Sequence, residues 1–169
     1  SKTQEEANQK EMERAKANDP VALCQVGKTH HHEGEYEEAV EYTVKAAKLG
    51  DMDAHLALAC YYEEGLGVEK DMKKAVYHWE EAAIGGHPHA RYNLGCYEGR
   101  NGTFNRATKH FMIAAKQGHD GALKVVEGNF RRGFVSKEEY ATALRGHQAA
   151  VDATKSEQRD AADAHMKNH

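Results

Sequence analysis

Residues 64–86, EGLGVEKDMKKAVYHWEEAAIGG, decide the fold. The stretch opens with a turn that contains Gly65 and Gly67. A segment with Ala75, Trp79 and an alanine pair at helical spacing follows the turn. The same order of residues recurs on both sides of this stretch. Because an internal period of about 20 to 50 residues sets the architecture of a repeat protein, the recurrence predicts an array of similar helical units.

An alanine pair marks each unit, and a glycine follows it three residues later. The pairs are spaced by 36 and then 32 residues: Ala46-Ala47, Ala82-Ala83 and Ala114-Ala115. Further columns keep the same step, with alanine at 39, 75 and 107, bulkier residues at Thr43, Trp79 and Phe111, and small residues at Gly27, Ala59 and Gly95. Small residues where helices approach closely, with bulky residues about one turn away, predict two packed helices in each unit. A glycine turn joins them, and four extra residues in the second turn account for the longer period.

These residues resemble a known family. The run 64–71, with Lys74, Ala75, Trp79 and Gly86, resembles the Sel-one-like repeat (SLR). The first and third units lack the long turn and are more similar to the shorter tetratricopeptide repeat of the parent superfamily, and such mixed arrays resemble predicted diatom repeat proteins. The resemblance covers roughly residues 19–150. It implies an all-α fold, a right-handed α-solenoid of stacked antiparallel helix pairs with a long C-terminal capping helix.

The chain is expected to divide at its helix-start signals. Asp19 and Pro20 suit the N-cap and first position of a helix, and Ser136 with Glu139 has the spacing of a capping box. We therefore predict a polar N-terminal helix over 1–18, repeats over 19–135, and a capping helix with a frayed tail over 136–169. The repeats are predicted at 19–51, 52–87 and 88–119, with a partial fourth at 120–135.

Composition narrows the function classes. The 169 residues are 40% hydrophobic and 30% charged with two prolines, which favours helices. A formal charge of −4 argues against general attraction to nucleic acid or an anionic membrane, so the expected partners are proteins or peptides. Three cysteines are too few for a disulfide framework, which predicts an intracellular, cytoplasmic location. Ser1 is not an initiator methionine, so a missing native start is expected.

No residue set points to catalysis or a cofactor. The 12 histidines include His30, His31 and His32, but HExxH and Cys-x-x-Cys motifs are absent from the sequence. Three consecutive helical residues point about 100° apart, so these imidazoles cannot all face one ion. We expect no enzyme, no cofactor and no metal site, and we keep a histidine-based metal-binding protein as a distant alternative. Trp79 shares a column with Phe111 and is expected in the core.

The predicted function is a non-enzymatic scaffold or adaptor that binds a peptide or protein, acidic peptides among them, in the concave groove. When the tetratricopeptide resemblance is applied column by column, it implies these groove residues: Lys28, His31, Glu63, Tyr92, Asn93, Arg100, Lys124 and Arg131. The later half of this set is basic and would attract acid groups. The alternatives are a solvated helix face at these positions and a self-associating structural protein that forms a homo-oligomer.

Overall fold

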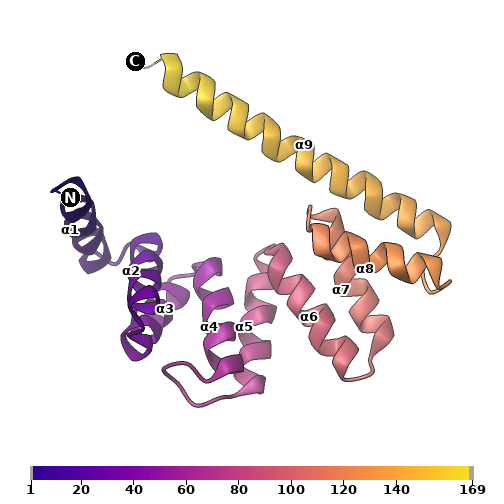
Figure 1. The fold of residues 1–169 in the computed structure, drawn as a ribbon, viewed down its shortest axis with the longest axis horizontal. Helices are drawn as coiled ribbons and strands as arrows, with labels where there is room; N and C mark the ends of the chain where they lie inside the picture. Colours follow the sequence, from indigo (N-terminus) through magenta and orange to yellow (C-terminus); the bar gives the residue numbers. More distant parts are fainter. Residues whose placement is uncertain (1, 168–169) are drawn as a thin grey trace. The chain divides into compact units, whose positions relative to one another are not determined.

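The computed structural model of the protein describes residues 2–167, which form nine α-helices and no strand (Figure 1). The helices are α1 (Lys2–Lys16), α2 (Pro20–Glu33), α3 (Tyr36–Lys48), α4 (Met52–Glu64), α5 (Met72–Ile84), α6 (Pro88–Arg100), α7 (Phe104–Lys116), α8 (Asp120–Arg131) and α9 (Lys137–Lys167). Helix pairs stack in order and a long helix ends the array, so the predicted all-helical fold of paired helices is confirmed. Fraying of the last turns of α9 stays a prediction.

The chain forms two compact units, residues 1–90 and residues 91–169, and each is described by itself. Helix α6 crosses the boundary between them. In the first unit α2 packs on α3 and α4 packs on α5, while α1 covers α2. In the second unit α7, α8 and α9 pack on one another. Over the described part of the chain, no helix combines the length and the apolar character needed to span a membrane.

Side-chain caps and left-handed glycines set the helix ends. Asp19 caps α2 by accepting hydrogen bonds from the backbone N–H groups of Val21 and Ala22, at 3.0 and 3.2 Å. At the start of α9 the Ser136 Oγ accepts from the Glu139 N–H (3.1 Å), and the Glu139 carboxylate accepts from the Ser136 N–H (2.8 Å). The predicted N-cap and capping box are therefore confirmed. Glycines with positive φ end the first helix of each pair.

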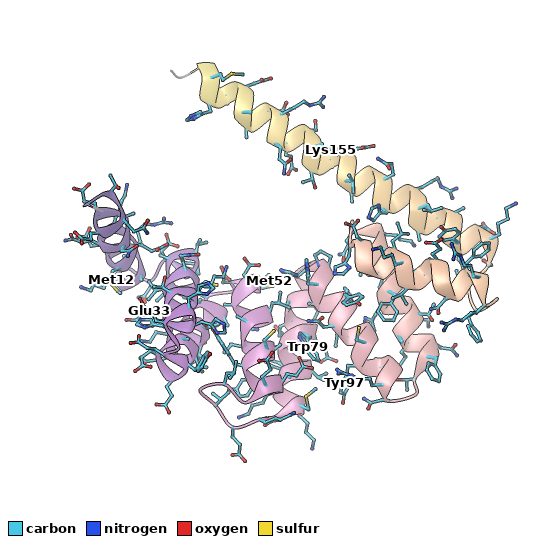
Figure 2. All side chains as sticks on the ribbon, viewed as in Figure 1. Met12, Glu33, Met52, Trp79, Tyr97 and Lys155 are labelled. Carbon is cyan, nitrogen blue, oxygen red and sulfur yellow. The ribbon has the colours of Figure 1, made fainter. Side chains whose placement is uncertain are left out.

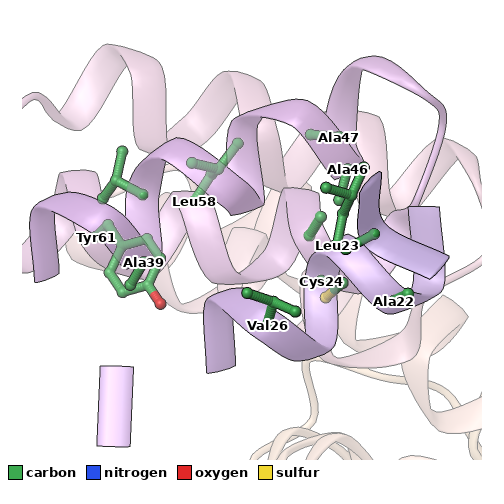
Figure 3. Close-up of a cluster of buried hydrophobic side chains, with 12 residues drawn as sticks. Ala22, Leu23, Cys24, Val26, Ala39, Ala46, Ala47, Leu58 and Tyr61 are labelled. Carbon is green, nitrogen blue, oxygen red and sulfur yellow. The ribbon is translucent and has the colours of Figure 1, made fainter. Parts of the chain in front are cut away.

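The core of residues 1–90 is built from alanines and a few larger side chains. Figure 3 shows Leu23, Leu58 and Tyr61 packed among the buried alanines of α2, α3 and α4. Gly27 brings α2 and α3 close together, because a Cβ at this position would lie 2.6 Å from the Thr43 Oγ1. The small-residue column thus faces the bulky column across the pair, as predicted. Trp79 is 1% exposed, which confirms its assignment to the core.

The long turn of the second repeat packs back onto the first repeat. A Cβ on Gly67 would lie 2.3 Å from the backbone oxygen of Tyr36, at the start of α3. Leu66 and Val68 from this turn contact the buried cluster of residues 1–90. On the other side of that cluster, Met12 of α1 packs against it, and Ala15 is buried. The turns of the first two repeats therefore lie at the same edge of this unit.

In residues 91–169, Gly95 plays the part of Gly27, since a Cβ there would lie 2.7 Å from the Phe111 ring. Helices α7 and α9 run in the same direction: Gly146 lies against Lys116 at the end of α7, and Ala150, further along α9, lies against Gly118, two residues beyond the end of α7. Only the first half of α9 is packed in this way. Beyond Val151 almost every described side chain is exposed, and Figure 2 shows Lys155 on this outer part of the helix.

Candidate peptide-binding surface

Lys28, the first predicted groove residue, belongs to a chain of polar contacts that links α2, α4 and the residue before α6. Its Nζ lies 3.8 Å from the Asp53 carboxylate on α4, and the same carboxylate lies 3.1 Å from the His87 Nε2 just before α6. Lys28 and Asp53 are both well exposed, so the attraction between them is weak and can be exchanged for a ligand. This part of the surface can therefore present an ammonium or a carboxylate.

Cys24 lies one turn before Lys28 and is buried. Burial, and secondarily the nearby Asp51 carboxylate, raise the pKa of the Cys24 thiol to about 11. Burial also raises the pKa of the Cys60 thiol, with the Glu63 carboxylate contributing. A thiol that stays protonated at neutral pH is a poor nucleophile. All three cysteines are free, and Cys24 and Cys60 fit a packing role.

His31 and Glu63 lie at the turn end of this unit. The His31 ring packs against Tyr36 and Tyr61, with ring centroids 5.4 and 5.6 Å apart, and its Nδ1 is buried with no hydrogen bond to a described residue. Glu63 is half-buried beside Cys60. His31 is thus held in an aromatic cluster, and only its remaining exposed edge is available to a ligand.

One group of side chains in the described residues has the spacing of metal ligands. His30, Glu33 and Glu35 place one ligand atom each within 4.8 Å of one another. The left-handed Gly34 brings Glu35 back over the helix end, where its carboxylate pairs with the His30 Nδ1 at 2.6 Å, and His30 stacks on Tyr42. This ion pair and ring stack explain the arrangement without an ion, although an imidazole and two carboxylates suit Zn²⁺ or a similar ion.

The second repeat holds a histidine pair between its two helices. The Nδ1 atoms of His55 and His78 lie 2.9 Å apart, so one ring donates to the other. His78 also stacks on Tyr62, and the Lys74 ammonium lies over the other ring of this stack, 5.1 Å from the centre of Tyr62. Burial, followed by His55 and Lys74, lowers the pKa of His78 to about 4. His78 is therefore neutral at pH 7, and the pair packs between the two helices.

In residues 91–169 Tyr92 is the best fixed of the predicted groove residues. It stacks on His119, with ring centroids 4.5 Å apart, and it contacts Phe111. The His119 Nδ1 caps α8 by accepting from the Ala122 N–H at 3.0 Å, which holds the ring in place. Gly121 leaves room beside Tyr92. The structure therefore joins Tyr92 of α6 to the first turn of α8, and the Tyr92 side chain remains partly exposed.

The predicted cations of this unit differ in how much they are already engaged. Lys124 is exposed one turn along α8 from Gly121. Arg131 is exposed but pairs with Glu127 on its own helix at 2.5 Å. Arg100 is exposed at the end of α6, and Asn93 is half-buried next to Tyr92. Lys124 beside the Tyr92–His119 stack is therefore the strongest local arrangement for an acid group.

Several interacting residues could not be singled out from the sequence. Glu98 on α6 is 7% exposed, pairs with Arg106 at 2.7 Å and accepts a hydrogen bond from the Thr103 hydroxyl. The available sequence signal for Glu98 was its position in the repeat, which His30 and Tyr62 occupy in the first and second repeats. Asp53, His87 and His119 lie in no column that suggests charge pairing or stacking, so the sequence offered no signal for them.

Comparison with known proteins agrees with this architecture. The family described as Sel1 repeat matches residues 20–51, 53–87 and 88–119, which together exceed half of the chain. Over 86 residues, 49% of this chain, the sequence is 34% identical to chitin synthase regulatory factor 4 of Schizosaccharomyces pombe. The matched region is 13% of that protein, so this chain corresponds to a small part of it.

Two solved structures share the fold. A Sel1 repeat protein from Oxalobacter formigenes has a TM-score of 0.75 at 24% identity, covering 88% of this chain and 64% of that chain. A protective antigen of uropathogenic Escherichia coli strains, which displays an SLR fold, has a TM-score of 0.67 at 20% identity, covering 88% of this chain and 34% of that one. At such identities the likeness concerns the fold alone.

Proposed function

This chain belongs to the Sel1 repeat family, whose members generally act as non-enzymatic protein-interaction scaffolds, and from that premise we propose that it is an adaptor that binds an acidic peptide segment. The single observation that supports the proposal most is the Tyr92 ring braced on His119 and lying against Gly121, one turn before the exposed Lys124 on α8. The first helices of stacked pairs line the inner surface of such arrays, and this surface is where they hold peptides.

The binding chemistry follows from the state of each side chain. Tyr92 has already lost its rotamer freedom to the His119 stack, so contact with a peptide costs little further ordering. Lys124 supplies the charge, and Asn93 can bond a peptide amide. Arg131 must exchange Glu127 for a ligand carboxylate, so we expect it to contribute less than its charge suggests. Arg100 supplies a further exposed cation at the end of α6.

The residues of the first unit form a separate part of the proposal. Lys28 can exchange Asp53 for a ligand carboxylate, while His31 and Glu63 are constrained by their neighbours. We propose that Lys28 is the main contact among these three. The predicted repeat boundaries, the cytoplasmic location and the likeness to diatom arrays stay parts of this proposal.

Affinity capture with the full chain tests the function. We expect captured protein partners to be lost on Tyr92→Ala and Lys124→Ala, and weakened by Arg131→Ala. Tyr77→Ala and Lys155→Ala are matched controls, because both side chains are exposed and neither is among the proposed contacts. Equal capture by the Tyr92 and Tyr77 variants would refute the assignment of this surface. Turnover of a small molecule, together with no captured protein, would refute the adaptor function.

A metal-binding protein is the second candidate, because His30, Glu33 and Glu35 have suitable spacing. Elemental analysis after gentle purification without added metal separates the two functions. A stoichiometric ion that is lost in His30→Ala and Glu35→Gln would favour the metal-binding function. The adaptor proposal expects no stoichiometric ion.

A further inference from the structure

The turns that join the two helices of each pair change charge along the chain. Equivalent positions place these turns at residues 31–38, 63–74, 99–106 and 131–138. The first has four glutamates and no lysine or arginine, and the second has four acidic and three basic residues. The third has two arginines and no acidic residue, and the fourth has three basic residues and one glutamate. The gradient runs from strongly acidic to basic.

Within each compact unit the two turns lie at one edge. In residues 1–90 the contact of Gly67 with the Tyr36 backbone joins the first two turns. In residues 91–169 the parallel course of α7 and α9 places Phe104 and Lys137, their first residues, at the same end of the unit. We name residues 31–38 with 63–74 the acidic turn edge, and residues 99–106 with 131–138 the basic turn edge.

The basic turn edge has the composition of an interface. Phe104 is 70% exposed and Phe134 is 74% exposed, and each comes from one of the two turns. Arg100 and Arg132 are exposed beside them in the sequence. Exposed aromatic side chains next to arginines are enriched in the energetically dominant parts of protein interfaces. Two phenylalanines left in water at one edge of a small unit indicate a partner surface.

The acidic turn edge has the complementary composition. All four glutamates of residues 31–38 are exposed, and Tyr36 among them is 36% exposed. Tyr36 occupies the position of Phe104 in its own repeat, at the first residue of the second helix. An acidic edge with a central aromatic residue matches a basic edge with two, whereas two edges of the same sign repel each other.

We propose that the basic turn edge of one molecule docks on the acidic turn edge of a second copy. This self-association goes beyond the peptide-binding adaptor, since its main contacts, which are Phe104, Phe134 and the glutamates of residues 31–38, are not among the proposed peptide contacts. Charge complementarity determines which edges pair, and the phenylalanines supply apolar burial. Attraction between exposed charges is screened by salt, so the association must weaken at high ionic strength.

Sedimentation velocity of the full chain tests the proposal, from about 1 to about 300 μM, the range over which a contact of micromolar affinity fills. At about 20 mM salt we expect the weight-average mass to rise with concentration, and at about 500 mM salt, where the Debye length falls below about 5 Å, to return toward the monomer. Phe104→Ala with Phe134→Ala should weaken association about tenfold or more. Ile84→Ala, which removes a side chain that is 77% exposed on α5, is the matched control.

Charge-reversal variants give the decisive test of which edges pair. Glu37→Lys with Glu38→Lys makes one variant, and Arg132→Glu with Lys137→Glu, both at exposed positions outside the proposed peptide contacts, makes the other. Each variant alone should stay monomeric, because one of its two edges has lost its charge. An equimolar mixture should associate, because the intact basic edge of the first variant then meets the intact acidic edge of the second. Circular dichroism checks that both variants fold. A wild-type chain that is monomeric throughout overturns the proposal, as does association that survives either reversal. Peptide capture should persist in both variants, so failure here is separate from failure of the adaptor function.

Discussion

Gly67→Ala is the substitution for which the structure predicts the sharpest effect. Gly67 has φ of 67°, and a Cβ there would lie 2.3 Å from the Tyr36 backbone oxygen. A left-handed conformation costs a residue with a Cβ roughly 1–2 kcal/mol, and overpacking against atoms that cannot turn away costs about 1–3 kcal/mol more. We therefore expect Gly67→Ala to lower the free energy of unfolding by about 2–5 kcal/mol.

Gly34→Ala is the matched control. Gly34 also has positive φ, at 81°, but nothing lies within 4 Å of a Cβ placed on it. This variant should lose only the conformational part, about 1 kcal/mol. Trp79 is the single tryptophan and lies in the repeat that contains Gly67, so its fluorescence reports denaturant unfolding of that repeat directly. Equal losses in the two variants would refute the close approach between the long turn and α3.

Three further predictions concern the polar contacts. His78→Tyr, which copies Tyr42 at the equivalent position, should make stability less sensitive to acid. His78 has a folded pKa of about 4 against an unfolded value near 6.5. The neutral ring therefore stabilises the wild type fully above pH 6.5, and this stabilisation is lost as the pH falls from 6.5 toward 4. Parallel pH profiles of the unfolding midpoint for the two proteins would contradict the prediction. Ser136→Ala should cost about 1 kcal/mol in denaturant unfolding by removing the cap of α9, and Ser156→Ala within the same helix should cost almost nothing. Arg106→Ala should cost about 2 kcal/mol, because the buried Glu98 loses a charged partner, whereas the exposed Lys109→Ala should be neutral in the same assay.

Features set by neighbouring residues in the sequence were predictable. The capping box joins Ser136 to Glu139 within one turn, and a left-handed glycine ends a helix whatever surrounds it. The close approach at Gly27 was also predictable, because the same column recurs at Gly95. The residues that allow two helices to pack closely recur in each repeat, so the helix pairing follows from the sequence alone.

Contacts made once could not be predicted. Asp53 pairs with His87 across 34 residues, and His55 meets His78 across 23, and neither pair repeats in the neighbouring units. Helix geometry keeps His30, His31 and His32 from facing one ion, but it does not reveal that Gly34 returns Glu35 to His30. The groove residues were placed by column, which gives a helix face but not the side chains already engaged there, such as Arg131 with Glu127.

The stacked rings between paired helices bear on how the array assembles correctly. In the first pair, His30 of α2 stacks its imidazole on the phenol of Tyr42 in α3. In the second pair the order is reversed, because Tyr62 of α4 stacks its phenol on the imidazole of His78 in α5. If α2 paired with α5 during folding, His30 would meet His78, and Tyr62 would be left to meet Tyr42. Similar repeats are prone to exchanging partners, and misassembly is a characteristic failure of such chains. Because the order of the two rings is reversed from one repeat to the next, it distinguishes the correct partner of each helix from the equivalent helix of the neighbouring repeat.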